Sequence, residues 1–394
     1  MSNKKKLIPA LRFPEFKEDG EWAYRYGNKL FQPISNKNHD SDLPILAITQ
    51  DSGAIPRELI DYTVIASKNS VKNYKIVEKG DFIISLRSFQ GGIEYSSYRG
   101  ICSPAYIILR KRVELERDFY KYYFKTPLYI QELNRNLEGI RDGKMVSYSQ
   151  FSEIYLPFPP LPEQQKIADC LSSLDDLLAA HNEKLELLKG HKKGLMQNLF
   201  PQEGERVPKF RFPEFENDGE WEEKKLGEIC SLKAGKFVAA SEINDSYTEG
   251  LHPCYGGNGL RGYTQSYTHT GRYSLIGRQG AHCGNITLAD GIFHATEHAV
   301  VVSPNSKIDT DWLFYTLELA NLNQYATGQA QPGLSVSNLE EVEFVFPNTI
   351  PEQKKIASCL SAVDDLIKAE TEKIEALKAH KKGLMQGLFP KMEN

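Results

Sequence analysis

The chain contains one long segment twice. Residues 161–201 return at residues 350–390 without a gap and about two-thirds identical. A second motif, RFPEF followed by DGEW, occurs at residues 12–22 and again at residues 211–221. Internal repetition of this kind indicates two halves that begin and end with the same segments. Because the regions between these matched ends diverge, we expect two heads that share a frame and bind different things.

The repeated segment predicts a long helix in each half. Apolar side chains recur at alternating spacings of four and three residues, which is a heptad seam. They are Ile167, Leu171, Leu174, Leu178, Leu185, Leu188, Leu195 and Leu199 in the first copy, and Ile356, Leu360, Val363, Ile367, Ile374, Leu377, Leu384 and Leu388 in the second. Two seam positions in each copy are polar, His181 and Lys192 in the first and Glu370 and Lys381 in the second. Pro-Glu at the first turn is typical of a helix start, and each helix should have about 38 residues and span about 57 Å.

Two such helices on one chain pair most simply as an intramolecular antiparallel coiled coil. In a symmetric pair, His181 and Glu370 are expected to face each other across the pseudo-two-fold axis and to help set the register. The alternative is that both polar side chains face solvent. The acidic pairs at residues 175–176 and 364–365 are interpreted as solvated, because adjacent residues on a helix point about 100° apart.

Composition is that of a globular protein with two or three domains, at 394 residues, 40% hydrophobic and 25% charged. No apolar run is long enough for a membrane span or a signal peptide, so a cytoplasmic protein is expected. The six cysteines are widely separated and form no Cys-x-x-Cys pair, which favours reduced thiols over disulfides. A net charge of -4 is not typical of a nucleic-acid binder, although basic residues cluster locally in both halves.

A fainter alignment joins the two globular parts. Residues 80–87 parallel residues 271–278, with a glycine, an aromatic residue two positions later, an apolar strand and then an arginine. Further strands are expected at residues 105–109, 299–302, 154–158 and 342–346. Short strands mixed with a few helices indicate two α+β domains, each closed by a strand that leads into its long helix. The expected segments are domain 1 at residues 1–160, the first helix at 161–201, domain 2 at 202–349 and the second helix at 350–394.

Glycine-rich loops follow the two arginine-bearing strands and are candidate DNA-reading loops. Arginine reads guanine and glutamine or asparagine reads adenine in the major groove, and glycine lets the backbone approach a ligand closely. The candidate DNA contacts are Arg87, Ser88, Gln90 and Lys144 in the first half, and Tyr255, Asn258, Arg261, Tyr263, Arg278, Gln279, His282 and Gln331 in the second. For each of them the alternative is a surface loop held by a turn or a salt bridge. The loop at residues 255–263 lacks the Gly-Lys-Ser/Thr ending of a phosphate-binding loop, so nucleotide binding is disfavoured.

Histidines are concentrated in the second globular part. They are His252, His269, His282, His294 and His298, with Cys254 and Cys283 nearby. Their spacing matches neither a zinc finger nor a zincin helix, and the first half has no equivalent cluster. No metal site is therefore expected.

Each of the two variable domains is followed by a helix that begins Pro-Glu-Gln-x-Lys-Ile-Ala and ends Lys-Lys-Gly-Leu-Met-Gln-x-Leu-Phe-Pro. In this arrangement the chain resembles the specificity subunit of a Type I restriction-modification system. The resemblance covers about residues 10 to 390. The second domain is similar to a common target-recognition type through residues 252–258, 277–280 and 329–332. The first domain resembles a looser family pattern through Gly80-Asp-Phe and residues 156–164.

This resemblance implies a non-catalytic DNA-reading subunit with two target recognition domains and no bound cofactor. Its implied partners are double-stranded DNA, two modification subunits that use S-adenosylmethionine, and two restriction subunits that use ATP and Mg. The sequence agrees, because it lacks a methyltransferase Asn-Pro-Pro-Tyr-type loop and a Gly-Lys-Ser/Thr loop. Alternatives are a two-headed protein-interaction scaffold, a subunit of a methylation-only complex, and a DNA-acting enzyme, for which the sequence offers no convergent acid, base or metal set.

Overall fold

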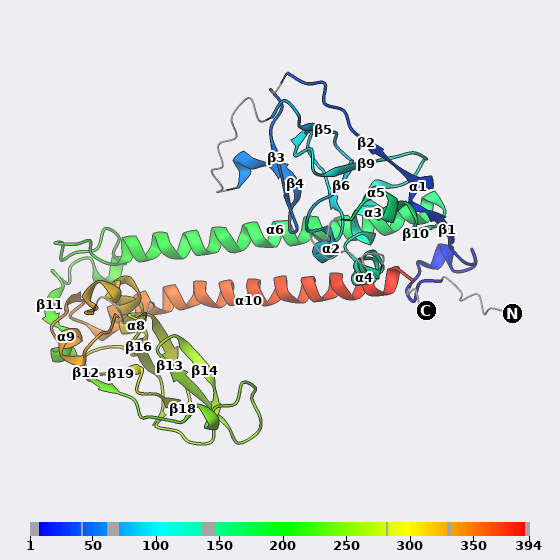
Figure 1. Ribbon diagram of the computed structural model, residues 1–394. Helices are drawn as coiled ribbons and strands as arrows, with labels where there is room; N and C mark the ends of the chain where they lie inside the picture. Colours follow the sequence, from blue (N-terminus) through cyan, green and yellow to red (C-terminus); the bar gives the residue numbers. More distant parts are fainter. Residues whose placement is uncertain are drawn as a thin grey trace. The chain divides into compact units, whose positions relative to one another are not determined.

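The computed structural model describes residues 8–40, 42–60, 71–135, 146–280, 283–328 and 332–390. The chain forms two compact units, one of Met1–Asn182 with Glu372–Asn394 and one of Glu183–Thr371 (Figure 1). Each unit therefore contains one globular domain, one part of the helix that follows this domain, and one part of the other long helix.

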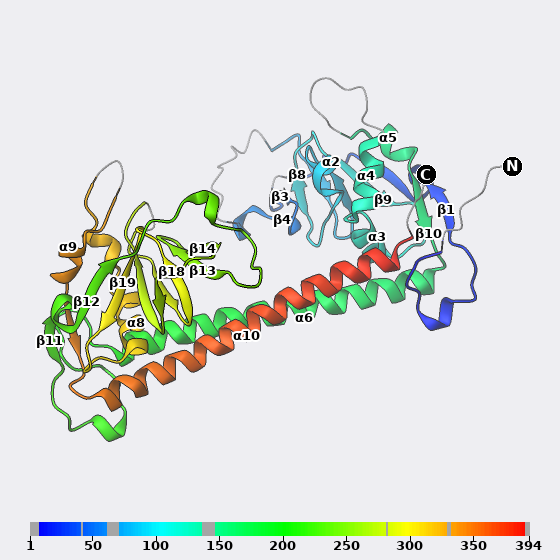
Figure 2. The same ribbon diagram turned by 90° about the horizontal axis from the view of Figure 1, so that it is seen from below.

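The two repeated segments form helices α6 (Leu161–Leu199) and α10 (Ile350–Leu388), each of 39 residues, as the heptad spacing predicts. In the first unit, Ile167 near the start of α6 shares a hydrophobic core with Leu388 at the end of α10. In the second unit, Leu199 at the end of α6 shares a core with Ile356 near the start of α10. The helices are therefore antiparallel within each unit, and Figures 1 and 2 show them side by side, which confirms the predicted intramolecular coiled coil. No helix in the described ranges is both long and apolar enough to cross a membrane.

One polar seam position, Lys381, takes part in a set of contacts with Asp175 and Tyr122 that we call the lysine brace. In the first unit, the ammonium of Lys381 on α10 bonds to a carboxylate oxygen of Asp175 on α6. The other carboxylate oxygen of Asp175 accepts a 2.7 Å hydrogen bond from the hydroxyl of Tyr122 in the globular domain. The Lys381 nitrogen also lies 5.0 Å from the centre of the Tyr122 ring. The brace thus joins both helices and the domain.

The second unit repeats this brace. Lys192 Nζ of α6 lies 2.9 Å from Asp364 of α10, and the Tyr315 hydroxyl donates to Asp364 at 2.8 Å. Lys192 Nζ also lies 5.2 Å from the centre of the Tyr315 ring and 3.1 Å from Glu318. The acidic residues at the first position of each Asp-Asp pair therefore hold helices together and are not simply solvated, because a lysine of the opposite helix and a tyrosine of the domain reach them.

The other polar seam position contains Glu370, which is buried and accepts a 2.8 Å hydrogen bond from Lys184 Nζ in the second unit. Its equivalent, His181, belongs to the first unit. The mutual facing of His181 and Glu370 stays a prediction.

Both domains contain a four-stranded antiparallel sheet of the same topology. In the first domain the order is β2 (Phe31–Ile34), β9 (Ile107–Lys111), β6 (Phe82–Ile84) and β7 (Glu94–Tyr95). In the second it is β12 (Cys230–Ala234), β19 (Ala299–Pro304), β16 (Tyr273–Gly277) and β17 (Ile286–Ala289). The strand that precedes Arg87 or Arg278 is third in each order, which confirms that the faint sequence alignment joins equivalent elements. The strand predicted at residues 105–109 begins two residues later.

A two-stranded sheet closes each domain. In the first, β1 (Ala23–Tyr26) pairs with β10 (Tyr155–Phe158), which leads into α6; in the second, β11 (Glu222–Lys225) pairs with β20 (Glu343–Phe346), which leads into α10. The predicted closing strands are thus present. Shorter helices surround the sheets: α1 (Gly27–Leu30), α2 (Ser88–Gly91), α3 (Arg117–Tyr123), α4 (Pro127–Arg135), α5 (Tyr148–Ser152), α7 (Leu226–Ile229), α8 (Thr310–Leu319) and α9 (Val336–Glu340).

The remaining strands differ between the domains. The first domain has the pairs β3 (Leu46–Thr49) with β4 (Gly53–Pro56), and β5 (Lys75–Val77) with β8 (Gly100–Cys102). The second has a second four-stranded sheet in the order β14 (Gly259–Thr264), β13 (His252–Gly256), β18 (Ile292–Ala295) and β15 (His269–Thr270). The common frame therefore supports different outer parts.

The repeated opening and closing motifs contact each other. Arg12 donates two hydrogen bonds to the Glu163 carboxylate at 2.7 and 2.8 Å, and a third to the Gly20 carbonyl at 2.6 Å. Arg211 and Glu352 repeat the paired bonds at the same two distances in the second unit. The RFPEF arginine thus fixes each domain to the first turn of its own long helix, which explains why these two motifs recur together.

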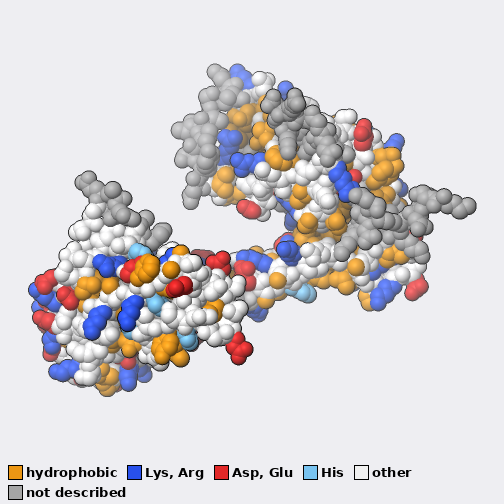
Figure 3. Space-filling view, turned by 60° about the horizontal axis from the view of Figure 1, so that its bottom comes forward, with side chains coloured by type: hydrophobic (Ala, Val, Ile, Leu, Met, Phe, Trp, Pro, Cys, Tyr) orange, Lys and Arg blue, Asp and Glu red, His pale blue; other side chains and the backbone are white. Residues whose placement is uncertain are grey.

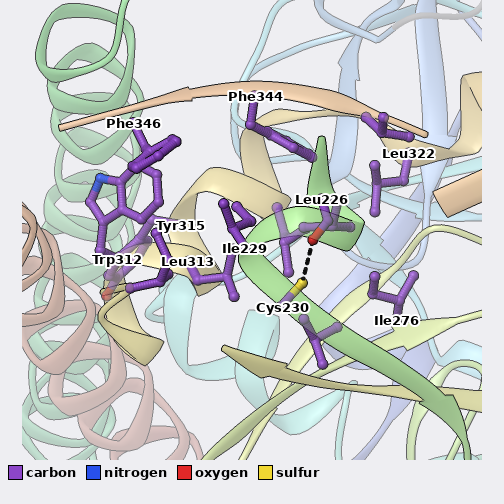
Figure 4. Packing of buried hydrophobic residues seen from close by; sticks show 14 of the residues in the cluster. Leu226, Ile229, Cys230, Ile276, Trp312, Leu313, Tyr315, Leu322, Phe344 and Phe346 are labelled. Carbon is purple, nitrogen blue, oxygen red and sulfur yellow. Dashed lines mark hydrogen bonds between the residues drawn. The ribbon is translucent and has the colours of Figure 1, made fainter. Parts of the chain in front are cut away.

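The core of the second domain packs α8 against α7 and β20. Trp312 and Leu313 of α8 lie in one cluster with Leu226 of α7 and Phe346 of β20 (Figure 4). The Cys230 thiol donates to the Leu226 carbonyl at 3.1 Å, and burial raises its pKa to about 12 (Figure 4). All six cysteines are free thiols, as predicted.

Candidate nucleic-acid interface

The tip of the β13–β14 hairpin lies directly against the loop that follows β16. A Cβ atom added at Gly277 would stand 1.8 Å from the Gly257 carbonyl oxygen, so the side-chain-free residue is required for this approach. A Cβ added at Gly257 would lie 3.2 Å from the His298 carbonyl oxygen and 3.5 Å from that of Gln279. Two glycines therefore bring the hairpin tip, with the exposed Asn258, next to the arginine loop.

The arginine loop is held on both sides by backbone hydrogen bonds. The Arg278 amide donates to the His298 carbonyl at 3.0 Å, and the Arg278 carbonyl accepts from the Leu334 amide at 2.9 Å. The Gly280 amide donates to the Pro332 carbonyl at 3.0 Å. Four segments far apart in sequence therefore meet: the hairpin tip, the arginine loop, the turn before β19 and the segment that begins at Pro332. We call this surface the converging loops.

The converging loops present polar groups suited to base edges. Asn258 and Gln279 are exposed, and Arg278 is half-buried. Arg261 is exposed on β14, and a Cβ added at Gly256 would lie 3.7 Å from its Cδ. Guanidinium and amide groups are those that read guanine and adenine in the major groove. The structure thus gathers four of the predicted residues of the second domain on one surface.

Two predicted aromatic contacts have ring partners in the domain. The Tyr255 ring is half-buried and packs edge-on against Phe293, with 5.7 Å between ring centroids. Burial raises the pKa of Tyr255. The Tyr263 ring lies 5.5 Å from the Tyr247 ring in a T-shaped arrangement. We assign the Tyr255 ring chiefly to packing, because it lies against the buried Phe293, whereas the partner of Tyr263 is the exposed Tyr247, so Tyr263 stays a predicted contact.

In the first domain, the predicted residues lie at the start of α2. Arg87 is exposed at the N-cap position and Gln90 is exposed one turn later. Ser88 is different, because its side chain is buried and its hydroxyl accepts a 2.9 Å hydrogen bond from the Ser85 amide. We therefore correct the interpretation of Ser88: it shapes the loop, whereas Arg87 and Gln90 are available to a ligand.

A half-buried lysine, Lys125, anchors the Arg87 loop, and the sequence pattern did not indicate it. Lys125 Nζ donates to the Gly91 carbonyl at 3.0 Å, to the Gln50 carbonyl at 3.2 Å and to Glu94 Oε2 at 2.6 Å. Glu94 is buried, and this burial raises its pKa to about 7 against the opposing effect of Lys125. The Arg87 loop is thus held by Lys125, which lies just after α3 and 38 positions after Arg87 in the chain. No local sequence motif indicates a contact between residues so far apart.

Three predicted contacts, Lys144, His282 and Gln331, lie outside the described residues. Gln331 directly precedes Pro332, which takes part in the converging loops. These three stay predictions.

Two of the described histidines of the second domain have hydrogen-bonding or ring partners within the domain. His294 is buried, with its two ring nitrogens 3.0 Å from Ser266 Oγ and 3.0 Å from the Lys236 carbonyl. His269 stacks on Phe293 at 5.5 Å, and burial lowers its pKa. Within the ranges that the structure describes, no three His, Cys, Asp or Glu side chains form a group that could hold a metal ion.

Charge alone does not mark the interface. Figure 3 shows lysine and arginine side chains interspersed with acidic ones over one face of the second unit. This pattern agrees with the net charge of -4. The converging loops are therefore distinguished by hydrogen-bonding groups and glycine-supported geometry.

The sequence model described as the Type I restriction modification DNA specificity domain matches residues 24–189 and again residues 218–379. The chain belongs to this family. One copy of the specificity domain falls in each half, so the two domains of this specificity protein are its two target recognition domains. Each match includes the first part of a long helix and ends inside it, at residue 189 of α6 and residue 379 of α10.

Curated relatives carry the same family name. The EcoprrI specificity subunit of Escherichia coli is 46% identical over 158 residues, which span 40% of this chain and 39% of that relative. The MjaVIII specificity subunit of Methanocaldococcus jannaschii is 26% identical over 343 residues, spanning 80% of this chain and 79% of the relative.

Solved structures show that the fold is shared. The crystal structure of a Type I S subunit from M. genitalium aligns with a TM-score of 0.64 at 16% identity, covering 98% of this chain and 100% of that chain. A chain from a study of complex assembly and conformational transition of the type I R-M system aligns with a TM-score of 0.52 at 18% identity, covering 94% and 97%.

Proposed function

We propose that this chain is a non-catalytic subunit that gives a Type I restriction-modification complex its DNA specificity. Each domain reads one half of an asymmetric, bipartite DNA site. The proposal is carried by the converging loops, which gather Asn258, Arg278 and Gln279 on one glycine-supported surface. The topologically equivalent position of Arg87 in the first domain supports a second reading surface. Because the domains share a sheet but differ in their outer parts, the two half-sites differ in sequence.

The proposal is tested by removing one arginine at a time. In the assembled complex, Arg87→Ala is expected to relax base preference in the first half-site only, and Arg278→Ala in the second only. A lost bidentate base contact corresponds to about 1–3 kcal/mol of discrimination at one position. The measurement is the methylated motif, mapped genome-wide for each variant. An unchanged motif in both folded variants contradicts the proposal, whereas relaxation of both half-sites by one variant indicates a folding defect.

The coiled coil of α6 and α10 serves as a spacer in this proposal. A rigid pair of helices would keep the two reading surfaces about one duplex turn apart, roughly 34 Å, and leave a gap of unread bases. Inserting seven residues at equivalent positions of both helices lengthens the coil by about 10 Å and preserves the heptad. The gap should then grow while both half-sites persist. A gap of unchanged length would contradict the spacer role.

Equivalent exposed leucines support docking of two identical partner subunits. Leu177 of α6 and Leu366 of α10 occupy the same repeat position and are 42% and 54% exposed. Three residues later each helix has an exposed alanine, Ala180 or Ala369, so a small apolar stripe recurs on each helix. Two modification subunits could each bury one stripe.

Aspartate substitutions test this docking. Leu177→Asp and Leu366→Asp should each reduce occupancy by one modification subunit, and the double variant by two, as measured by native mass spectrometry. Leu187→Asp is the matched control, because Leu187 is 68% exposed but its equivalent in α10 is Ala376. Equal loss of partners in all three single variants would contradict the assignment.

The chain itself would bind no cofactor. The modification subunits would use S-adenosylmethionine, and two restriction subunits would use ATP and Mg. Copurification distinguishes this complex from a methylation-only one, and a gel shift with the assembled subunits distinguishes DNA reading from the scaffold alternative.

A further inference from the structure

Unpartnered polar atoms gather at the converging loops. Among the described residues, nine buried side-chain nitrogen or oxygen atoms lack a hydrogen-bond partner, and three of them belong to this surface. They are Arg278 Nε, Glu297 Oε2 and His298 Nδ1. A buried polar atom without a partner is unfavourable unless a ligand or water supplies the missing bond. Their concentration here marks a place where bound DNA would complete the hydrogen bonding.

The turn at residues 296–299 carries Glu297 and His298 into this surface. The Thr296 amide donates to the Tyr255 carbonyl at 2.9 Å, and the His298 carbonyl accepts from the Arg278 amide at 3.0 Å. The turn is therefore fixed to both the hairpin and the arginine loop. The Glu297 and His298 side chains are 34% and 40% exposed, whereas the unpartnered Glu297 Oε2 and His298 Nδ1 atoms are themselves buried, so a ligand reaches these two atoms when the side chains turn outward.

His298 contacts only one of the two Glu297 carboxylate oxygens. His298 Nε2 lies 3.3 Å from Glu297 Oε1, whereas Glu297 Oε2 has no partner. The second oxygen of Glu297 can accept one hydrogen bond, and the ionised carboxylate has no hydrogen to donate. It repels the phosphate backbone, so it can add discrimination between bases but no general affinity for DNA.

We propose that Glu297 is a specificity-determining residue of the second domain and accepts a hydrogen bond from the exocyclic amino group of a cytosine in the major groove. The inference rests on the proposed DNA-reading function. Carboxylates accept from cytosine N4, whereas guanine O6 and thymine O4 are themselves acceptors and would repel the carboxylate. Adenine is disfavoured because its N7 acceptor calls for a donor beside its amino group, which asparagine or glutamine provides and glutamate lacks.

The test compares two neutralising substitutions in the assembled complex. Glu297→Gln should reduce discrimination at one base pair of the second half-site by roughly tenfold to a hundredfold. Glu249→Gln removes the same charge at an exposed position of the same domain and should leave every position unchanged. Binding selection from a randomised duplex library gives the preference at each position, and retention of the first half-site shows that the variant is folded and assembled.

Comparison with Arg278→Ala shows whether Glu297 contacts a base itself or only positions Arg278. Our inference predicts that Arg278→Ala and Glu297→Gln relax different base pairs. Relaxation of the same base pair would overturn it, because Glu297 would then only position Arg278. Full discrimination in Glu297→Gln beside a selective wild-type complex overturns this inference alone, whereas a wild-type complex without any sequence preference overturns the proposed function as well.

Discussion

Arg211 is expected to contribute strongly to the stability of the second unit. Its guanidinium donates two hydrogen bonds to Glu352, and the two side chains are 8% and 1% exposed. The Trp221 indole donates to the same carboxylate at 3.3 Å. Replacing Arg211 by alanine leaves a buried carboxylate without its cation. Breaking a buried ion pair in this way costs about 3–5 kcal/mol.

The same motif supplies a matched control. Lys355 and Glu214 form a 3.1 Å ion pair beside the buried one, but their side chains are 51% and 46% exposed. An exposed pair contributes about 1 kcal/mol or less. Lys355→Ala therefore removes one cation from the same region with a much smaller expected loss of stability.

Hydrogen exchange measures both variants. The slowest amides of the β12–β19–β16 sheet should exchange roughly a hundredfold to a few thousandfold faster in Arg211→Ala, and less than about tenfold faster in Lys355→Ala. The double substitution of Arg211→Met with Glu352→Gln should recover much of the loss, because it removes the unpaired charge. Equal effects of Arg211→Ala and Lys355→Ala would refute the reasoning from burial.

Three further outcomes follow from other contacts. Gly277→Ala places a Cβ 1.8 Å from the Gly257 carbonyl, so base discrimination in the second half-site should fall by about tenfold or more while the first is retained, as measured by library selection. Burial raises the pKa of Glu94 from 4.5 to about 7, so the folded state favours the neutral acid. The free energy of unfolding of the first unit should therefore decrease as pH rises from about 5 to 7. Urea unfolding midpoints should show this decrease in the wild type and not in Glu94→Gln. Lys192→Met breaks the lysine brace of the second unit and should cost about 1–2 kcal/mol there, seen by hydrogen exchange, with the equivalent Lys381→Met affecting the first unit.

Repetition and spacing were sufficient to predict the frame of each unit. The heptad seam predicted both long helices, and the alignment through Arg87 and Arg278 predicted equivalent strands. The polar seam residues Lys192 and Lys381 could be recognised as exceptions, but their aspartate and tyrosine partners come from another helix and from the domain. Such long-range pairings leave no local pattern in the sequence.

The reading surface was only partly predictable for the same reason. Residue type indicated Asn258, Arg278 and Gln279, but it could not show that Ser88 is buried or that the Tyr255 ring packs on Phe293. Glu297 was not among the predicted contacts and His298 was considered only as a possible metal ligand, since their position beside Arg278 depends on the close approach of Gly257 and Gly277. The glycine-rich loops were recognised in the sequence, but the sequence could not show which distant segments they bring together, because the approach of Gly257 to Gly277 depends on the folded hairpin.

The most direct measurement of the central claim is the methylome of cells that have the partner subunits, with and without this chain. We predict one asymmetric motif that depends on the chain and consists of two specified half-sites separated by a gap of fixed length. A methylated motif that persists without the chain, or one without a gap, would contradict the account.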